Sequence, residues 1–325
     1  MSFSSLVKNE ICRIDNIENC CLKAELAAII AVGGNINIVE DQGIDIKIIT
    51  ENAAFARRAY SLFKKLFGIS VEVKCRKGKK LTKHTSYELI ISNSDEARKI
   101  IEELKIEFNI NDEKKFPDII HNIEKSITNS CCKRAYLRGA FLAGGSISDP
   151  EKTYHIELTS RFPSLARKLK EMINSYNLNS KIIKRKGYYV VYLKEGDHIV
   201  DFLNIIGAHS ALLKMENIRI LKDMRNNVNR IVNCETANLE KTVNASVRQI
   251  RNIEYIRDYL GLDKLPKNLR EIAELRMKYR DASLKELGEM LDPPLGKSGV
   301  NHRLRKLEKI AKDDFNNKTH STSAQ

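Results

Sequence analysis

Residues 131–147 read CCKRAYLRGAFLAGGSI, and this stretch decides the fold because residues 20–36, CCLKAELAAIIAVGGNI, nearly repeat it. The two segments align without a gap at a spacing of 111 residues. Each begins with two adjacent cysteines, continues through small and apolar residues, and reaches Gly-Gly before a final isoleucine. A helix-like segment that occurs twice in this way predicts a duplicated domain rather than one isolated buried helix.

Small residues indicate how the two copies meet. Gly139 and Ala143 are four positions apart, so they share one helix face. Their counterparts in the first copy are Ala28 and Val32. Because small side chains let two helix backbones approach closely, we expect the copies to pack against each other across a pseudo-two-fold axis. The last glycines, Gly34 and Gly145, are expected to form the left-handed turn that ends a helix.

The same order of elements follows each segment. Apolar and polar residues alternate at Gly43–Ile49 and at Tyr154–Leu158, which is the period of a half-buried strand. An amphipathic helix, a hairpin with a basic turn and a further helix come next in both halves. Each half therefore predicts the order α-β-β-α-β-β-α, and the fold class is α+β, with helices packed on one face of each antiparallel sheet.

Beyond residue 213 the strand pattern disappears. Polar residues at Arg225–Arg230 and Asn233–Asn238 predict a break in an otherwise helical linker. We interpret Asn233–Asn238 as a capped turn, the alternative being a hinge or docking site. The predicted parts are a first half at 1–106, a connector at 107–128, a second half at 129–224, a helical linker at 225–262, a helix-turn-helix domain at 263–314 and a disordered tail at 315–325.

Composition narrows the class of partner. The 325 residues carry a formal net charge of +14, which favours a polyanion such as nucleic acid, although a bias towards lysine-rich composition is the alternative explanation. Seven cysteines form no C-x-x-C pair, which favours reduced thiols in the cytoplasm and argues against a metal site. The adjacent cysteines are interpreted as buried apolar residues at the starts of the motif helices, the alternative being a redox or metal role. No apolar run reaches the roughly 20 residues that span a bilayer, and we expect no signal peptide.

The C-terminal region predicts a helix-turn-helix. Ser283 and Glu286 form a capping-box pattern, which predicts that a supporting helix begins there and stops before Pro293-Pro294. Ser298 is expected to cap a second, recognition helix that runs to about Ala311. The apolar residues of that helix fall within one arc, and they are Val300, Leu304, Leu307 and Ala311. The segment Leu269–Tyr279 is predicted to supply the preceding helix, and Gly288 is expected where two helices cross.

The recognition helix also carries the chemistry that reads DNA. Asparagine pairs with adenine and arginine with guanine edges, so Asn301, Arg303 and Arg305 are the expected base readers. Lys297, Lys306 and Lys309 are expected to contact phosphates. The complete predicted DNA-binding set is Ser283, Lys285, Lys297, Ser298, Asn301, His302, Arg303, Arg305, Lys306 and Lys309. A small helical bundle with a solvated basic face, or a module that binds a protein partner, is the alternative.

Two predicted hairpin turns are also basic. We expect them either to contact phosphate in a sequence-independent way or to be solvated tips whose lysines discourage edge pairing. The residues with expected secondary phosphate contacts are Arg76, Lys77, Lys79, Lys80, Lys184, Arg185 and Lys186.

The repeated segment resembles the LAGLIDADG motif of homing endonucleases. Six residues of the second copy match the motif, and they are Leu137, Gly139, Ala143, Gly145, Ser146 and Ile147. In that family an acidic metal ligand precedes the final glycine, whereas this chain has Gly33 and Gly144 at those positions. The resemblance therefore implies the fold without catalytic residues, metal or cofactor. The enzyme alternative is a metal-dependent endonuclease with displaced carboxylates, for which Asp149 lies five residues beyond the motif position.

Three further stretches resemble the WhiA family of Gram-positive bacteria. They are KSGVNHRLRKL at 297–307, SLKELGEML at 283–291 and NCETAN at 233–238. The resemblance implies a degenerate LAGLIDADG domain followed by a helix-turn-helix, in a transcriptional regulator of cell division, chromosome segregation or sporulation. It implies double-stranded DNA as the partner, a regulatory protein partner in some members, and a place in the cytoplasm with the nucleoid. A protein-protein interaction platform is the third alternative.

Overall fold

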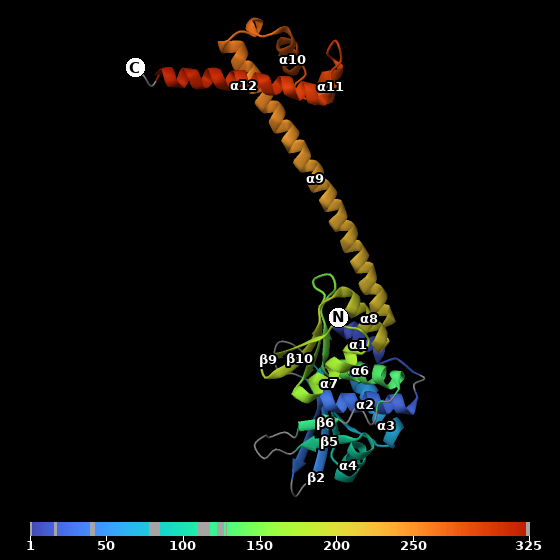
Figure 1. Ribbon diagram of the computed structural model, residues 1–325. Helices are drawn as coiled ribbons and strands as arrows, with labels where there is room; N and C mark the ends of the chain where they lie inside the picture. The colour runs from blue at the N-terminus through green and yellow to red at the C-terminus, as the bar shows by residue number, and fades with distance from the viewer. Residues whose placement is uncertain are drawn as a thin grey trace. The chain divides into compact units, whose positions relative to one another are not determined.

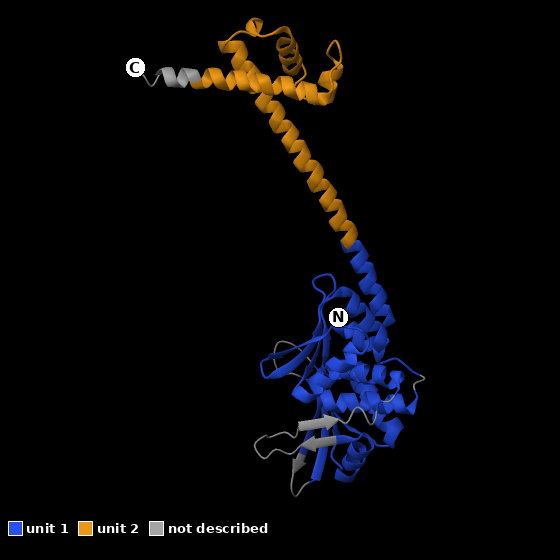
Figure 2. Cartoon of the chain, in the orientation of Figure 1, with its two compact units in different colours: residues 1–222 blue, residues 223–325 orange. Residues whose placement is uncertain are grey.

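The computed structural model describes residues 2–15, 18–39, 43–77, 85–109, 118–121, 127 and 129–322. The chain divides into two compact units, residues 1–222 and residues 223–325 (Figure 2). Within the described ranges, no helix is both long enough and apolar enough to cross a membrane.

The first half of unit 1 has a four-stranded antiparallel sheet with the strand order β1-β2-β4-β3. Its helices bury their apolar faces against this sheet, so the alternating residues Ile46 and Ile48 lie in the core. In chain order the elements are α2 (Asn19–Gly33), β1 (Gly34–Val39), β2 (Gly43–Thr50), α3 (Ala53–Phe67), β3 (Glu72–Lys77), β4 (Thr85–Ile91) and α4 (Ser94–Glu103).

The second half repeats this topology with the strand order β7-β8-β10-β9. Its elements are α6 (Ser130–Gly144), β7 (Gly145–Ile147), β8 (Ile156–Ser160), α7 (Pro163–Asn174), β9 (Lys181–Arg185), β10 (Tyr188–Leu193) and α8 (Gly196–Ile206). The predicted duplication of an α-β-β-α-β-β-α unit is therefore confirmed, and Figure 1 shows α2 and α6 side by side in the middle of unit 1.

The pairing of α2 with α6 depends on small residues, as predicted. A Cβ atom added to Gly139 would collide with the carbonyl oxygen of Glu25 and would lie 3.0 Å from the Cβ of Ala28. The two backbones therefore meet where Gly139 lacks a side chain.

The predicted left-handed turn at Gly34 and Gly145 is wrong. Gly34 has φ −75° and ψ 140°, and Gly145 has φ −87° and ψ 148°, so both are extended and lead directly into a strand. Their lack of a side chain has a different cause. A Cβ on Gly34 would lie 2.5 Å from the carbonyl oxygen of Ile30, and one on Gly145 would lie 2.6 Å from that of Phe141. The sharp exit from each helix thus excludes a side chain.

Three elements of unit 1 were not expected from the sequence. Helix α1 (Phe3–Ile11) begins where the Ser2 side chain accepts a hydrogen bond from Ser5 N, and it buries residues four apart, Phe3, Val7 and Ile11. The expected connector contains a two-stranded sheet formed by β5 (Ile106–Asn109) and β6 (Asp118–His121). The other connector positions, apart from Ile127, lie outside the described residues.

The predicted break between the units is also wrong, because α9 runs without interruption from His209 to Tyr259. Asn233–Asn238 is part of this helix rather than a capped turn. The sequence from 209 to 259 contains neither glycine nor proline, so polar side chains alone do not interrupt the backbone hydrogen bonds. The residues that suggested a break are instead exposed on the helix surface, as is every residue from 223 to 244.

Limited digestion with trypsin should cut α9 first, at Arg225, Arg230 or Lys241. Side chains from 223 to 244 are exposed, so this part of the helix gains little from tertiary packing and opens at low free energy. Mass spectrometry of the early fragments checks this. Earlier cleavage at the lysines and arginines of α7, which packs on a sheet, would contradict it.

Unit 2 is helical and has its own core. After the last turns of α9 come the short 3₁₀ helix η1 (Leu262–Lys264), α10 (Lys267–Lys278), α11 (Leu284–Glu289) and α12 (Lys297–Thr322). Ile253 and Ile256 of α9 are fully buried in this core, so the part predicted as linker already belongs to the C-terminal domain at these residues. Helix α12 continues to Thr322, which contradicts the predicted disorder of 315–322, and the last three residues lie outside the described chain.

Candidate nucleic-acid interface

The supporting helix α11 begins at the predicted capping box. The Ser283 hydroxyl accepts a hydrogen bond from Glu286 N at 3.2 Å, and Ser283 N donates to the Glu286 carboxylate at 2.7 Å. The backbone hydrogen bond from Ser283 lowers the pKa of Glu286. The capping box therefore fixes where α11 starts, and the helix ends at Glu289, before Pro293-Pro294 as predicted.

The turn between α11 and α12 closes on Gly288. Leu295 N donates to the Gly288 carbonyl oxygen at 2.9 Å. A Cβ on Gly288 would collide with the Leu295 carbonyl oxygen and lie 3.2 Å from a methyl group of Val300. Gly288 thus lies where α11 meets α12, as the sequence predicted, and a larger residue there would force the turn apart.

Helix α12 buries the predicted apolar arc. Val300, Leu304 and Leu307 are no more than 2% exposed, and Ala311 is also buried. The helix begins one residue earlier than predicted, at Lys297, and its first hydrogen bond runs from Val300 N to the Gly296 carbonyl oxygen at 3.1 Å. Ser298 is therefore inside the first turn and is not the cap that the sequence predicted.

The predicted DNA-binding residues divide by their position on the helices. Two half-buried members lie on opposite flanks of α12. Arg303 donates through Nη1 to the Asn268 carbonyl oxygen of α10 at 3.3 Å, whereas Asn301 is four residues from Arg305 and shares its flank. The exposed members are Ser283, Lys285, Lys297, Ser298, His302, Arg305, Lys306 and Lys309. The structure thus brings most of the set to the solvent side of α11 and α12, while Arg303 also links α12 to α10.

Two charged side chains of unit 2, Glu308 and Arg276, have partners within that unit. Glu308 accepts from Lys312 Nζ at 2.9 Å and lies 3.6 Å from Arg248 Nε of α9. The hydrogen bond from Lys312 lowers the pKa of Glu308, so the one acid between Lys297 and Lys312 is ionised and already paired. Arg276 of α10 is 2% exposed and donates through Nη1 to the Ala282 carbonyl oxygen at 2.6 Å. No pattern in the sequence indicated this buried arginine, which links α10 to the start of α11.

The basic hairpin turns of unit 1 are only partly described. Lys79 and Lys80 lie outside the described residues. Arg76 on β3 pairs with the buried Glu88 of β4 at 3.1 Å, so this arginine has a structural partner, while Lys77 is exposed at the end of β3. The second turn carries the exposed set Lys184, Arg185 and Lys186.

The centre that binds metal in homing endonucleases lacks room for carboxylates here. A Cβ on Gly144 would lie 2.5 Å from Val32 Cγ1 and 2.7 Å from the Thr159 carbonyl oxygen. One on Gly33 would lie 3.0 Å from the Cβ of Ala143. Asp149 is exposed, and its carboxylate accepts from Glu151 N at 3.1 Å within the turn after β7.

A surface hollow lies beside this centre, between residues of both sheets. Its described lining consists of Asn35, Asn37, Lys47, Ile49, Arg161, Gly187 and Tyr188. Arg161 donates to the Asn35 side chain at 2.6 Å across the two halves. This lining offers amides and cations and, among the described residues, no carboxylate for a hard divalent cation.

A buried ion-pair network joins α2, α3 and α6, and no pattern in the sequence indicated it. The Glu25 carboxylate accepts from Arg58 Nε at 2.8 Å, from Arg58 Nη2 at 3.1 Å and from Arg138 Nε at 2.9 Å. Glu25 is fully buried and the side chains of both arginines are less than 10% exposed. Burial is the largest influence on Arg58 and lowers its pKa, but the hydrogen bonds to Glu25, the charge of Glu25 and other nearby acidic groups together outweigh burial and raise the pKa.

Comparison with known families agrees with this architecture. Three family models match, in chain order: the WhiA N-terminal LAGLIDADG-like domain at 19–107, the WhiA LAGLIDADG-like domain at 133–225 and the WhiA C-terminal HTH domain at 228–311. The chain belongs to the WhiA family. The third match begins inside α9, consistent with the contribution of that helix to the core of unit 2.

Two relatives and a solved structure match this chain along almost its whole length. The chain is 56% identical to a probable cell division protein WhiA of Alkaliphilus metalliredigens, over 96% of this chain and 98% of the relative. It is equally identical to one from Ruminiclostridium cellulolyticum, over 96% and 97%. The crystal structure of full-length DUF199/WhiA from Thermatoga maritima aligns with a TM-score of 0.58 at 27% identity and covers 96% of this chain and 99% of that chain.

Proposed function

We propose that this WhiA protein is a double-stranded DNA-binding transcriptional regulator without catalytic activity, and that α12 is its recognition helix. The observation that carries the proposal is the solvent side of α12, which presents Arg305, Lys306 and Lys309 from a helix whose opposite side is buried in the core of unit 2. Such a helix, preceded by a supporting helix and a turn, fits the major groove.

The chemistry of this face suggests separate roles. Arg305 and Asn301 share one flank and have the donors and acceptors that read guanine and adenine edges. The phosphate contacts are assigned to Lys297, Lys306 and Lys309. Such contacts supply binding affinity that falls as the salt concentration rises. The second basic turn of unit 1 is proposed as an additional, sequence-independent phosphate contact.

The absence of catalysis is inferred from the centre of unit 1. Hydrolysis of DNA by a LAGLIDADG centre requires carboxylates that hold divalent cations. Gly33 and Gly144 lack them, and the close contacts at Gly144 leave no space for a carboxylate side chain there. The printed name of the relatives, probable cell division protein, supports a regulatory role in cell division, with chromosome segregation and sporulation as the related processes.

Arg305→Ala should weaken binding to the preferred duplex by about 1–3 kcal/mol and relax the preference at one base position. Lys309→Ala should weaken binding to all sequences alike and reduce the salt slope by about 1. Selection from random duplexes identifies the site, and fluorescence anisotropy at several salt concentrations measures the binding. Lys241→Ala, which removes the same charge from α9, is the control and should bind as the unaltered protein does.

Three outcomes would overturn the proposal. Unaltered affinity and specificity in both Arg305→Ala and Lys309→Ala, or no salt-dependent DNA binding, would favour a protein-protein interaction platform. Cleavage of plasmid DNA with Mg²⁺ or Mn²⁺, abolished by substitution of an acidic residue, would favour an endonuclease.

A further inference from the structure

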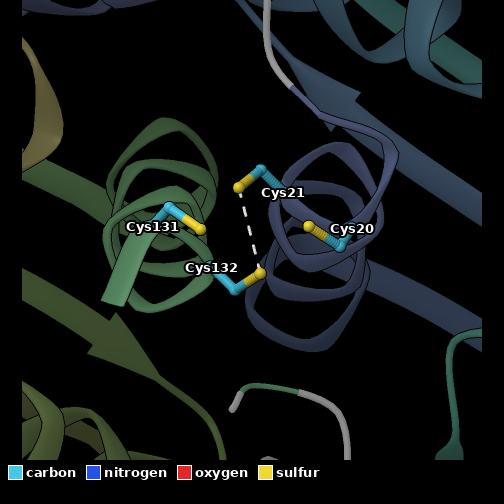
Figure 3. Close-up of side chains that lie close together, drawn as sticks. All are labelled: Cys20, Cys21, Cys131 and Cys132. Carbon is cyan, nitrogen blue, oxygen red and sulfur yellow. Dashed lines mark hydrogen bonds between the residues drawn. The ribbon is translucent and has the colours of Figure 1, made fainter. Parts of the chain in front are cut away.

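Four cysteines meet at the N-terminal ends of the paired helices. Cys20 and Cys21 begin α2, and Cys131 and Cys132 begin α6, so each half of the duplication supplies one adjacent pair (Figure 3). All four sulfur atoms lie within 4.8 Å of one another. The Sγ atoms of Cys21 and Cys132 are 3.9 Å apart.

These distances match one particular kind of ion. A tetrahedral zinc site has Zn–S bonds of about 2.3 Å, which places its sulfurs roughly 3.8 Å apart. The Sγ atoms of Cys21 and Cys132 match this separation, and no two of the four sulfurs are more than 4.8 Å apart. A four-iron cluster would hold its cysteine sulfurs farther apart because the iron atoms lie between them. The size of the cluster therefore favours a single thiophilic ion.

The ends of the two helices place partial positive charge beside the sulfurs, whereas burial raises the pKa of Cys21 and Cys132. In both helices the cysteines occupy the second and third positions, where the helix dipole stabilises negative charge. Neither α2 nor α6 has a side chain that caps its N-terminus, in contrast to α3 and α4, which are capped by Asn52 and Asn93. Sulfur anions would supply the negative charge that the uncapped ends lack.

The burial of the sulfurs also suits a metal site. Cys21 and Cys132 are buried between the helices, whereas Cys20 and Cys131 are exposed, so an ion has an entry path. Cys20 Sγ donates to the Glu18 carboxylate at 3.5 Å, a contact that metal binding would replace. The other cysteines of the chain, Cys12, Cys75 and Cys234, lie elsewhere and form no such group among the described residues.

We propose that Cys20, Cys21, Cys131 and Cys132 bind one Zn²⁺ ion through four thiolates and so cross-link the two halves of unit 1. Binding releases the thiol protons to solvent and leaves all four sulfurs coordinated. The sequence argued against a metal site because the chain has no C-x-x-C pair. That argument fails here because the ligand pairs come from two copies of a repeat and meet only after α2 packs on α6.

Titration of the reduced, metal-free full chain with Co²⁺ tests the stoichiometry and the ligands. We expect one Co²⁺ per chain, with the visible bands of tetrahedral cobalt and intense thiolate-to-cobalt bands, and displacement of the cobalt by Zn²⁺. The variant Cys20→Ser/Cys131→Ser changes exposed residues and should bind at least about 100-fold more weakly, since losing a residue that binds the metal costs more than losing one that only hydrogen-bonds to such a residue. The control Cys75→Ser/Cys234→Ser should bind unchanged.

Alkylation provides a readout that does not depend on the stability of a variant. Zn²⁺ should protect the exposed Cys20 and Cys131 from alkylation, while the exposed Cys75 and Cys234 react equally with and without metal, as mass spectrometry of peptides would measure. The proposal would be overturned by the absence of stoichiometric binding, by equal binding in Cys20→Ser/Cys131→Ser, or by a Cys21–Cys132 disulfide in protein trapped directly from cells.

Discussion

Glu25→Ala should lower the free energy of unfolding of unit 1 by about 3–5 kcal/mol. The substitution removes the only carboxylate among the described residues that accepts from both Arg58 and Arg138, and it leaves two buried guanidinium groups facing each other. An uncompensated buried charge costs more than a pair contributes, because the remaining ions have lost their hydration. Glu25→Gln keeps the shape of the side chain but removes its charge. It should also lower the free energy of unfolding of unit 1, which separates the effect of charge from that of packing.

The control variant replaces all three charged residues of this network with apolar ones. Glu25→Leu combined with Arg58→Met and Arg138→Met should recover most of the loss, because apolar residues of similar volume need no partners. Because the two units can unfold separately, hydrogen exchange of peptides from α2 and α6 during urea denaturation is the appropriate measurement. A loss below about 1 kcal/mol in Glu25→Ala would show that the arginines find other acceptors or reach water.

Gly288→Ala should disrupt the helix-turn-helix and abolish specific DNA binding, with a cost of about 1–3 kcal/mol or more from overpacking. Alanine normally stabilises a helix relative to glycine by roughly 0.5–1 kcal/mol, so the expected sign is opposite to that of helix propensity. The reason is the carbonyl oxygen of Leu295, which occupies the position of the added Cβ and belongs to the backbone of the turn.

The same turn contains a matched control. Gly296 has no atom within 4 Å of an added Cβ, so Gly296→Ala should change stability by no more than about 0.5 kcal/mol. Thermal unfolding, hydrogen exchange of α11 and α12, and DNA binding of both variants test this. Equal stability of Gly288→Ala and Gly296→Ala would mean that the turn relaxes without cost.

The sequence was sufficient for the duplicated fold and for the buried side of α12. The repeat predicts that α2 packs on α6, because small residues such as Gly139 on one helix face allow a second helix to approach closely. The apolar arc of Val300, Leu304 and Leu307 follows directly from helical period, which is local. By contrast, a glycine can serve either a left-handed conformation or the close approach of other atoms, and the sequence does not distinguish the two. At Gly34 the structure shows close approach, because the chain leaves α2 so sharply that a Cβ would meet the carbonyl oxygen of Ile30.

The parts of the site that were missed involve partners far apart in the chain. Glu25 and Arg138 are 113 residues apart, and nothing local to either residue signals the other. The orientation of Arg303 depends on a backbone carbonyl at Asn268 in another helix. The cysteines were visible in both repeats, but their use as a group requires the contact between α2 and α6.

The Glu25–Arg138 pair makes the two halves of unit 1 complementary to each other rather than interchangeable. In a symmetric homodimer of the first half, Glu25 would face Ala27 of the other copy, since Ala27 occupies the position of Arg138 in the alignment. In a homodimer of the second half, Arg138 would face Tyr136, the equivalent of Glu25. In the first homodimer Glu25 would keep Arg58 of its own half but lose the arginine across the axis, and in the second Arg138 would lose its carboxylate. The ion pair across the axis therefore forms only when two unlike halves meet, as they do within this single chain.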